Sequence, residues 1–246
     1  MDEIQKRLLL EVADLHEVPE GAYNIRANSQ SAGRRSTANI EITSKQDVSG
    51  LEIRIRPGTK NESVHIPVVM TESGLKEVVY NDFFIGEDAD VVIVAGCGID
   101  NCGNQDSQHD GVHRFYVGPG AKLVVRERLM THGVQQAVST YDVKLNGKDS
   151  SADVVSRSVA RDKSFQKFDA KIVGKAPCSG HTECDSIIMD EGRILAVPGL
   201  EADHVDASLF HEAAIGKIAG EQLTKLMTLG LTETEAEEQI INGFLR

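Results

Sequence analysis

The sequence has few positive charges and no long apolar run. Its 246 residues include 26 Lys and Arg against 38 Asp and Glu, which gives a net charge of -12 at pH 7. A field of that sign repels phosphate backbones and anionic lipid, and no apolar stretch approaches the length of a membrane span. The one small basic group, Arg26, Arg34 and Arg35, lies in a Ser- and Gly-rich stretch typical of a solvated loop. We therefore expect neither nucleic acid nor a membrane as a partner.

Cysteine is scarce, with four residues in the chain. The opening Met1-Asp2-Glu3 lacks the basic region of a secretory signal, which predicts a cytoplasmic protein. Because the cytosol keeps thiols reduced, we expect no disulfides and four thiols free for metal or sulfur chemistry.

Two signatures of self-sufficient catalysis are also absent. The sequence has no glycine-rich loop of the kind that cradles nucleotide phosphates, and no Gly-x-Ser-x-Gly nucleophile elbow. Any step driven by ATP therefore requires a partner protein.

The apolar pattern predicts an N-terminal helix over residues 2–16. Ile4, Leu8, Val12 and Leu15 recur at spacings of three and four, which gives the helix one apolar face. After Pro198 the pattern becomes helical again, first over 220–229 and then in a helix that a capping box begins. The predicted caps of the first and last helices are Asp2 and the Thr232/Glu235 pair.

Between the helical ends, short Val- and Ile-rich runs alternate apolar with polar residues, which is typical of half-buried strands. The predicted strands are 38–43, 51–56, 64–69, 90–95, 112–117, 121–126, 136–145, 152–159, 168–173, 185–189 and 193–197. No helical segment separates them, which excludes a doubly wound sheet or a TIM barrel. Periodicity alone leaves a sandwich, a barrel and a β-solenoid open, and no strict hexapeptide repeat is present. We predict three parts: 1–35, a β body over 36–200, and a helical segment over 201–246.

Three clusters of polar residues are candidates for chemistry. The first holds Cys97, Cys102, His109 and His113 and suits a soft metal, although it also fits a polar loop that contains cysteines. The second runs from Cys178 to Asp185, and strand alternation predicts that Cys184 faces away from Glu183 and Asp185; a small buried side chain is the simpler interpretation of Cys184. The third comprises His204, Asp206, His211 and Glu212, which are common on a solvated surface.

The C-terminal third, over roughly residues 175–246, resembles the SufB/SufD core family of iron-sulfur cluster assembly proteins. The resemblance rests on short blocks in one order: Glu183-Cys184-Asp185-Ser186, Pro198-Gly199-Leu200-Glu201, His211-Glu212-Ala213-Ala214-Ile215-Gly216 and Ile240-Ile241-Asn242-Gly243-Phe244. His109-Asp110-Gly111-Val112-His113 is similar to short archaeal-type members. The resemblance implies a right-handed parallel β-helix with flanking helices, of which the C-terminal ones dock a SufC-type ATPase.

The resemblance also implies site residues. Cys184 matches the sulfur-accepting cysteine of the SufB-like subunit, and Glu212 matches the family's functional glutamate, next to the histidine matched by His211. Phe210 departs from an acidic residue in the larger scaffold, which puts an identical ligand set in doubt. The long N-terminal region of that scaffold has no counterpart here, which suggests a homodimer.

These implications give a leading hypothesis and two alternatives. In the first, the chain is a scaffold, not an enzyme, that accepts sulfur or iron at Cys184 and Glu212 and holds a transient iron-sulfur cluster. Its partners are a SufC-like ATPase, a sulfur donor and acceptor apoproteins. The further predicted ligands are Cys97, Cys102, Cys178, His109 and His211. The alternatives are a mononuclear metalloenzyme built on His109, His113 and Asp110 with Glu212 as base, and a structural SufD-like subunit with inert cysteines.

Overall fold

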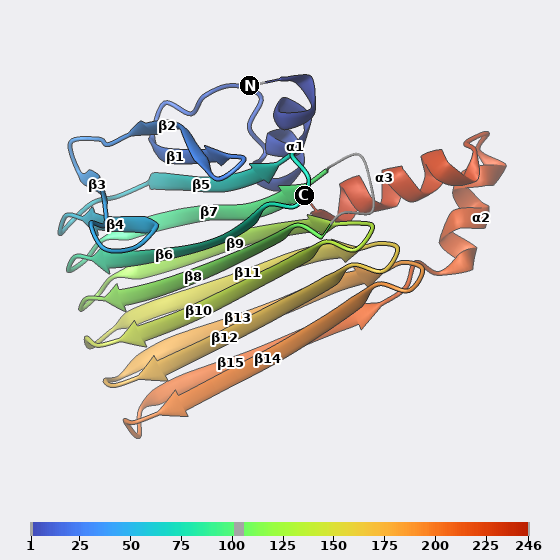
Figure 1. Cartoon of the computed structure of the whole chain (residues 1–246). Helices are drawn as coiled ribbons and strands as arrows, with labels where there is room; N and C mark the ends of the chain where they lie inside the picture. Colours follow the sequence, from blue (N-terminus) through green and yellow to red (C-terminus); the bar gives the residue numbers. More distant parts are fainter. Residues whose placement is uncertain (1, 101–105, 246) are drawn as a thin grey trace.

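The computed structural model describes residues 2–100 and 106–245. In this part of the chain, strands form a parallel β-solenoid of about six turns, with one N-terminal helix and two C-terminal helices (Figure 1). This confirms the predicted β-helix with flanking helices. The helices are α1 (Glu3–Ala13), α2 (Gly220–Thr228) and α3 (Glu233–Leu245).

The strands form two sheets, and from β4 onward successive strands along the chain alternate between them. Sheet A has the order β15 (Ala207–Gly216), β13 (Cys178–Ile188), β11 (Ser150–Ala160), β9 (Lys122–Thr131), β7 (Asp90–Ile99), β5 (Glu62–Met70), β1 (Ala22–Ala27) and β2 (Gln30–Arg35). Sheet B has the order β14 (Arg193–Ala202), β12 (Phe165–Gly174), β10 (Gln136–Leu145), β8 (Gln108–Val117), β6 (Lys76–Ile85), β4 (Gly50–Ile55) and β3 (Ile40–Ser44). Neighbours pair in parallel except β1 with β2 and β3 with β4. Each further pair of strands therefore adds one turn to the coil.

Alternate residues of each strand fill the inside of the coil. On sheet B, one inward column holds Ile53, Phe83, Phe115, Val143 and Ile172 on successive strands, all buried. The rings of Phe83 and Phe115 stack with centroids 4.4 Å apart. Burying such a side chain contributes about 1.5–3 kcal/mol. Repetition of these columns along the axis holds the turns in register.

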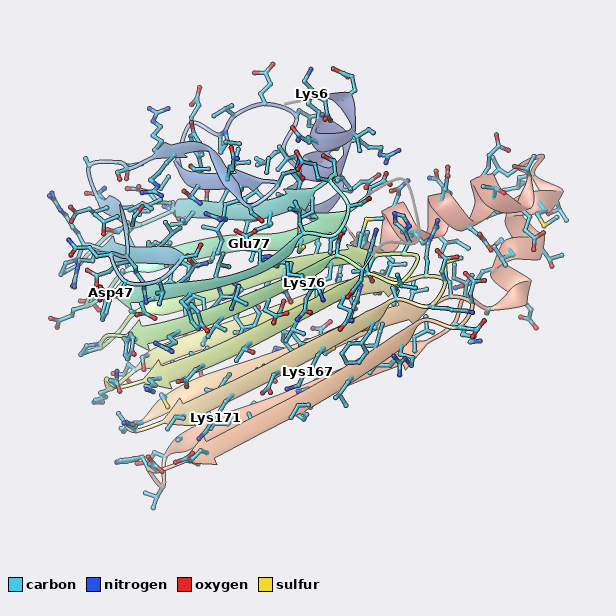
Figure 2. All side chains as sticks on the ribbon, in the orientation of Figure 1. Lys6, Asp47, Lys76, Glu77, Lys167 and Lys171 are labelled. Atoms are coloured by element: carbon cyan, nitrogen blue, oxygen red, sulfur yellow. The ribbon has the colours of Figure 1, made fainter. Side chains whose placement is uncertain are left out.

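Charged side chains line much of the outer surface (Figure 2). On β12, Lys167 lies 2.7 Å from Asp169 and Lys171 lies 2.5 Å from Glu201 of β14, both through Nζ. Because these side chains remain partly exposed to solvent, each pair adds little to stability.

Helix α1 lies on the outer face of sheet A over two glycines of β7. A Cβ at Gly96 would lie 2.6 Å from the carbonyl oxygen of Val12, and one at Gly98 would lie 3.1 Å from a methyl group of Leu8. The helix therefore requires small residues beneath it. Its N-terminus has the predicted Asp2 cap, whose carboxylate accepts from the N–H of Gln5 at 2.8 Å.

Helix α3 packs farther down the same face, and α2 stands away from the body (Figure 1). Ile241 and Leu245 of α3 are buried against Val159 of β11. The predicted capping box is confirmed, because the hydroxyl and backbone N–H of Thr232 both lie 2.8 Å from Oε2 of Glu235. None of the helices in the described ranges is long and apolar enough to cross a membrane.

Several secondary-structure predictions were wrong. The chain does not become helical directly after Pro198, because β14 continues to Ala202 and β15 follows. The Ser- and Gly-rich stretch around Arg26 forms β1 and β2 rather than a loop, and β6 was missed. In β6 the inward residues include the polar Glu77 and Asn81, so the expected alternation is hidden. Strands of sheet A thus lie on both sides of 36–200, and the three-part division stays a prediction.

Candidate functional site

Cys184 lies on β13 and points into the coil. Its side chain is 1% exposed, and its neighbours in the same inward column are Ser156 of β11 and Ala213 of β15. The sulfur lies 3.7 Å from Oγ of Ser186. Burial raises the pKa of this thiol, and the contact with Ser186 offsets part of that rise. The thiol is therefore protonated and enclosed in this conformation, one strand from the end of the coil.

Glu212 lies on β15 and points to the outside. Its register partner on β13 is Glu183, whereas Cys184 pairs with Ala213. Side chains of register partners in parallel strands share a face, and adjacent residues of one strand face opposite ways. The sheet therefore separates the Cys184 thiol from the Glu212 carboxylate within one chain.

His211 shares the inner face with Cys184. Its Nδ1 lies 2.7 Å from Oγ1 of Thr182, the residue two positions before Cys184. The structure thus places the imidazole beside the last enclosed turn, on the thiol's side of the sheet. Of the two adjacent candidates on β15, only the histidine faces the interior with Cys184.

Cys178 also points inward but lies far along the same strand. It is 8% exposed, and burial raises the pKa of its thiol. Six residues of extended strand separate it from Cys184, a distance of about 20 Å. The two thiols do not share one metal ion in this fold.

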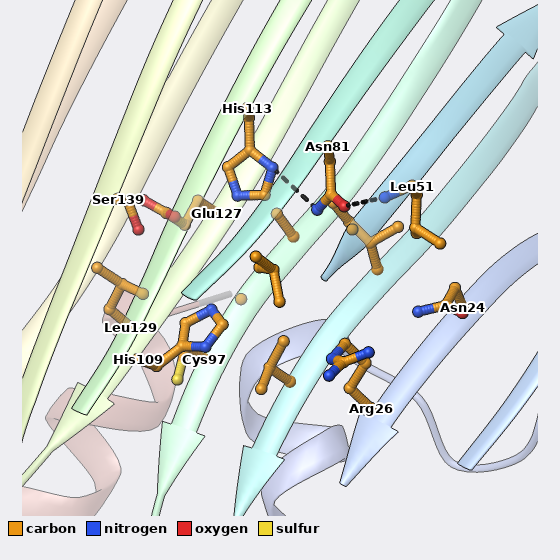
Figure 3. A pocket seen from close by; sticks show the side chains of 16 residues that line it. Asn24, Arg26, Leu51, Asn81, Cys97, His109, His113, Glu127, Leu129 and Ser139 are labelled. Carbon is orange, nitrogen blue, oxygen red and sulfur yellow. Dashed lines mark hydrogen bonds between the residues drawn. The ribbon is translucent and has the colours of Figure 1, made fainter. Parts of the chain in front are cut away.

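Cys97 lies inside β7, beneath α1, and is 1% exposed. Burial raises the pKa of its thiol well above the usual value, and the carboxylates of Glu77 and Glu127 add to this. It lines a cavity of about 20 Å³ together with His109 and His113 (Figure 3). That is room for about one water molecule. Cys102, its predicted companion, lies outside the described residues.

His113 is held as a neutral imidazole. The amide oxygen of Asn81 accepts from the N–H of Leu51 at 3.1 Å, so the amide nitrogen donates to Nδ1 of His113 at 3.3 Å (Figure 3). The ring proton then lies on Nε2. Burial, with a smaller effect of nearby His109, lowers the pKa of His113 to about 3. A ring locked in this tautomer offers no free lone pair to a metal.

Asp110 does not join the two histidines. Strand alternation turns it outward, where both of its oxygens accept from Nε2 of Gln108, at 3.0 and 2.9 Å. Among residues 2–100 and 106–245, no three His, Cys, Asp or Glu side chains are close enough to hold one metal ion. The set His109, His113 and Asp110 is therefore not brought together.

Two buried carboxylates were missed by sequence reasoning. Glu77 of β6 is 6% exposed; Arg26 donates Nε to its Oε1 at 2.8 Å, and Nδ1 of His109 lies 3.7 Å from its Oε2. Burial acts to raise the pKa of Glu77, but the contacts with His109 and Arg26 outweigh it and lower that pKa. The sequence signal for Glu77 would have been a charged residue at an inward position of a strand. It was overlooked because the strand itself, β6, was not predicted.

The second missed carboxylate, Glu127 of β9, is enclosed by hydroxyl groups. It is 3% exposed and accepts from Tyr141 at 2.8 Å and from Ser156 at 2.7 Å. Burial raises its pKa despite these bonds. Because Ser156 lies between Glu127 and Cys184 in one inward column, the carboxylate belongs to the polar interior that leads to the thiol.

Comparison with known proteins identifies the group to which these features belong. Residues 101–244, more than half of the chain, match the family model described as the SufBD core domain of the SUF system for FeS cluster assembly. The chain belongs to the SufBD family. The matched range includes Cys184, His211 and Glu212.

Similar SufBD proteins occur in archaea. An iron-sulfur cluster assembly SufBD family protein of Methanothermobacter thermautotrophicus is 43% identical over 105 residues, which cover 42% of this chain and 26% of that protein. One of Archaeoglobus fulgidus is 29% identical over 263 aligned positions, covering 81% of this chain and 69% of that protein. The chain thus spans about a quarter of the length of the Methanothermobacter relative. Membership in the SufBD family supports a role in iron-sulfur cluster assembly.

Proposed function

We propose that this SufBD chain is a scaffold on which an iron-sulfur cluster is built, and that Cys184 accepts the sulfur or iron. The observation that carries the proposal is the place of Cys184 on β13, one strand from the unpaired end of the coil and on the inner face with His211. Thiolates are the preferred ligands of iron-sulfur centres, and an imidazole beside the thiol is a further ligand for iron.

Sulfur would reach Cys184 by exchange with a protein persulfide. The Cys184 thiolate attacks the outer sulfur of the donor, a new S–S bond forms at Cys184, and the donor's S–S bond breaks to leave the donor as a thiolate. No electrons are gained or lost overall. Since burial keeps the thiol protonated, the step requires that the end of the coil open.

We also propose that Glu212 contributes to the site. An assembly site that uses both Cys184 and Glu212 would lie at the end of the coil. Strands β14 and β15 are the last of their sheets and leave one backbone edge each unpaired. Leu195 and Leu200 of β14 are 47% and 43% exposed, and Phe210 and Ile215 of β15 are 59% and 43% exposed. Such edges are templates for pairing with another chain. We place a homodimer contact here, where a second copy would bring its own Glu212 near the thiol.

The proposed ATPase partner would bind the C-terminal helices. Helix α2 has no buried residue, and its apolar side chains include Met227, 44% exposed; Leu229, just after the helix, is 76% exposed. An amphipathic helix with an uncovered apolar face is a common docking element. A SufC-type ATPase on α2 and α3 would supply the ATP-driven step that the chain lacks.

A structural role without sulfur chemistry is the second candidate. The observation that favours it is that Cys97, Cys178 and Cys184 are all buried, with pKa values raised by burial. Inert structural cysteines have this environment.

Anaerobic reconstitution with iron and sulfide separates the two candidates. The scaffold predicts sulfur-to-iron charge-transfer absorption in the wild type that is lost in Cys184→Ser and retained in Cys178→Ser, a matched control on the same strand. Absorption that is absent from all three proteins, alone and with the ATPase, would favour the structural role. Co-purification with the ATPase, tested with and without Met227→Lys, checks the proposed helix contact.

A further inference from the structure

A groove lies between α1 and α3, where the C-terminal ends of β7, β9, β11 and β13 meet the two helices (Figure 1). Its volume is about 600 Å³, within the range of sites that enclose small ligands. Among the described residues that line this α1–α3 groove, none belongs to α2 or β15. The groove is therefore separate from the exposed face of α2 and from the open end of the coil.

The floor of the groove is apolar. Leu8 of α1 and Ile241 of α3 are each 2% exposed, and Val159 of β11 is 1% exposed. Met130 and Met189 are partly buried and pack against the cluster of Val159 and Ile241. Because methionine side chains are flexible and polarizable, they adapt to apolar groups of different shapes. The floor can therefore receive an apolar side chain from an occupant.

The rim of the groove is acidic. Carboxylates outnumber guanidinium groups by six to two: Glu11, Asp100, Asp162, Asp190, Glu237 and Glu238 against Arg7 and Arg161. Arg7 forms ion pairs with Glu11 and Asp100 on the α1 side. The other four carboxylates have no ion-pair partner among residues 2–100 and 106–245. Most of the negative charge around the groove is therefore not neutralised by this chain.

Carboxylates of the two helices act on each other across the groove. Burial raises the pKa of Glu11 on α1, and the negative charges of Asp100 and of Glu238 on α3 add to the rise, although Arg7 opposes it. Such crowding of like charges favours a cationic occupant. Within the described ranges, no three of these groups are close enough to hold one metal ion. The arrangement therefore suits several positive charges spread along a chain.

Arg161 adds a requirement that a simple polyamine does not meet. Its Nε is buried and has no hydrogen-bond partner in the part of the chain that the structure describes. Buried donors nearly always have a partner in a complete structure. A Lys or Arg side chain offers only donors, whereas a main-chain carbonyl oxygen accepts. A guanidinium that turns onto such a carbonyl would be satisfied by a peptide.

We infer that the α1–α3 groove binds a basic peptide segment of a partner protein. One or two apolar side chains of the segment lie on the methionines of the floor, its Lys or Arg side chains pair with the acidic rim, and a main-chain carbonyl accepts from Arg161. Peptides that present apolar anchors to a groove are recognised in this way in many complexes. The inference goes beyond the proposed scaffold and does not depend on iron, sulfide or the ATPase.

Three labelled peptides test the inference on the unaltered full chain by fluorescence anisotropy. The first is a short peptide of Leu and Lys, the second replaces each Lys by Glu, and the third replaces each Leu by Ser. We expect only the Leu and Lys peptide to bind, and its affinity to fall as the salt concentration rises. Absence of binding by that peptide would overturn the inference. Equal binding of the Ser and Lys peptide would also overturn it, because attraction to any acidic protein would then suffice.

Variants of the rim place the peptide on the protein. Glu237→Gln combined with Glu238→Gln should raise the Kd for the Leu and Lys peptide about fivefold, the effect of losing two exposed ion pairs. The matched control, Glu41→Gln with Glu87→Gln, removes the same charge from exposed positions outside the groove and should leave the Kd nearly unchanged. Equal Kd values for the two double variants would contradict the proposed place. Thermal unfolding checks that each variant is folded.

Arg161→Met separates docking in the groove from attraction by charge alone. Loss of a cation would by itself strengthen the binding of a basic peptide, whereas loss of the donor weakens it. A hydrogen bond from a charged group outweighs one exposed charge, so we expect weaker binding. Tighter binding would overturn the role of Arg161. Affinity that is lost in Met227→Lys and kept in the Glu237 and Glu238 variant would place the peptide on α2 and overturn the inference.

Discussion

Cys184 and Glu212 lie on neighbouring strands, β13 and β15, yet their side chains project from opposite faces of sheet A. Glu212 pairs in register with Glu183, and Cys184 pairs with Ala213. Any site that uses both groups therefore needs a second chain or a displacement of β15. Because Glu212 lies outside the core, its substitution can affect function without affecting stability.

Glu212→Gln is expected to leave stability almost unchanged. The side chain is outside the core, and exposed substitutions usually stay within about 0.5 kcal/mol. If the carboxylate is a ligand, reconstituted charge-transfer absorption falls in the same variant. Thermal unfolding and anaerobic absorption measure the two effects, and Glu201→Gln on β14 is the matched control. Unaltered cluster yield in Glu212→Gln would remove Glu212 from the site.

Arg26→Ala should strongly destabilise the fold. The Arg26 and Glu77 side chains are 16% and 4% exposed, so removal of the cation leaves a buried carboxylate beside His109. Loss of one partner of a buried pair costs about 3–5 kcal/mol. Urea unfolding gives the free-energy change. Arg26→Met with Glu77→Met should recover most of it; if the double variant is as unstable as Arg26→Ala, the pairing does not explain the loss.

Acidification should destabilise the protein through His113. Its pKa is about 3 in the fold against about 6.5 in an unfolded chain, so the unfolded state binds the extra proton between these values. Stability is complete above pH 6.5 and falls by up to about 1.4 kcal/mol per pH unit below it. Denaturant unfolding at pH 7.5, 6 and 5 measures the slope. In His113→Gln the slope should be reduced by this contribution, and an unchanged slope would contradict the assignment.

Gly96→Ala should detach α1. The new Cβ would lie 2.6 Å from the carbonyl oxygen of Val12 and 2.8 Å from that of Arg128, and neither backbone atom moves easily. Hydrogen exchange of residues 3–13 should rise, whereas the strands of sheet B stay protected. Gly216→Ala, where a Cβ meets nothing within 4 Å, is the control. Equal protection of α1 in both variants would show that the helix tolerates the extra methyl group.

Ile215→Lys tests the proposed homodimer. Ile215 is 43% exposed at the open end of the coil, on the inner face in register with Ser186. A charge there should weaken pairing between two ends, because edge strands with inward-pointing charges resist association. Sedimentation velocity should show a shift toward monomer, whereas Val78→Lys, at a similarly exposed position on β6, retains the dimer. A wild type that is monomeric at all concentrations would remove the homodimer from the proposal.

The strands of the body and the caps of the helices could be read from the sequence because they depend on local periodicity and on single side chains. Asp2 and the Thr232/Glu235 pair form the predicted caps, and the outward turn of Glu183 and Asp185 follows from alternation within one strand. Where polar residues occupy inward positions, as Glu77 and Asn81 do in β6, the same rule hides the strand. Strand β15 was missed because its apolar residues do not alternate with polar ones in the sequence: Leu209 and Phe210 are adjacent, and so are Ala213, Ala214 and Ile215.

Contacts between turns of the coil were decided by tertiary structure alone. Strand alternation says that residue 184 faces away from its two neighbours, but only the register between β13 and β15 says that Glu212 lies on the opposite face of the sheet from Cys184. The same holds for Arg26 and Glu77, 51 positions apart, and for Arg157 and Phe244, 87 positions apart. Local pattern determines how each strand divides its side chains between inside and outside, whereas the stacking of strands far apart in the chain determines which of those side chains meet.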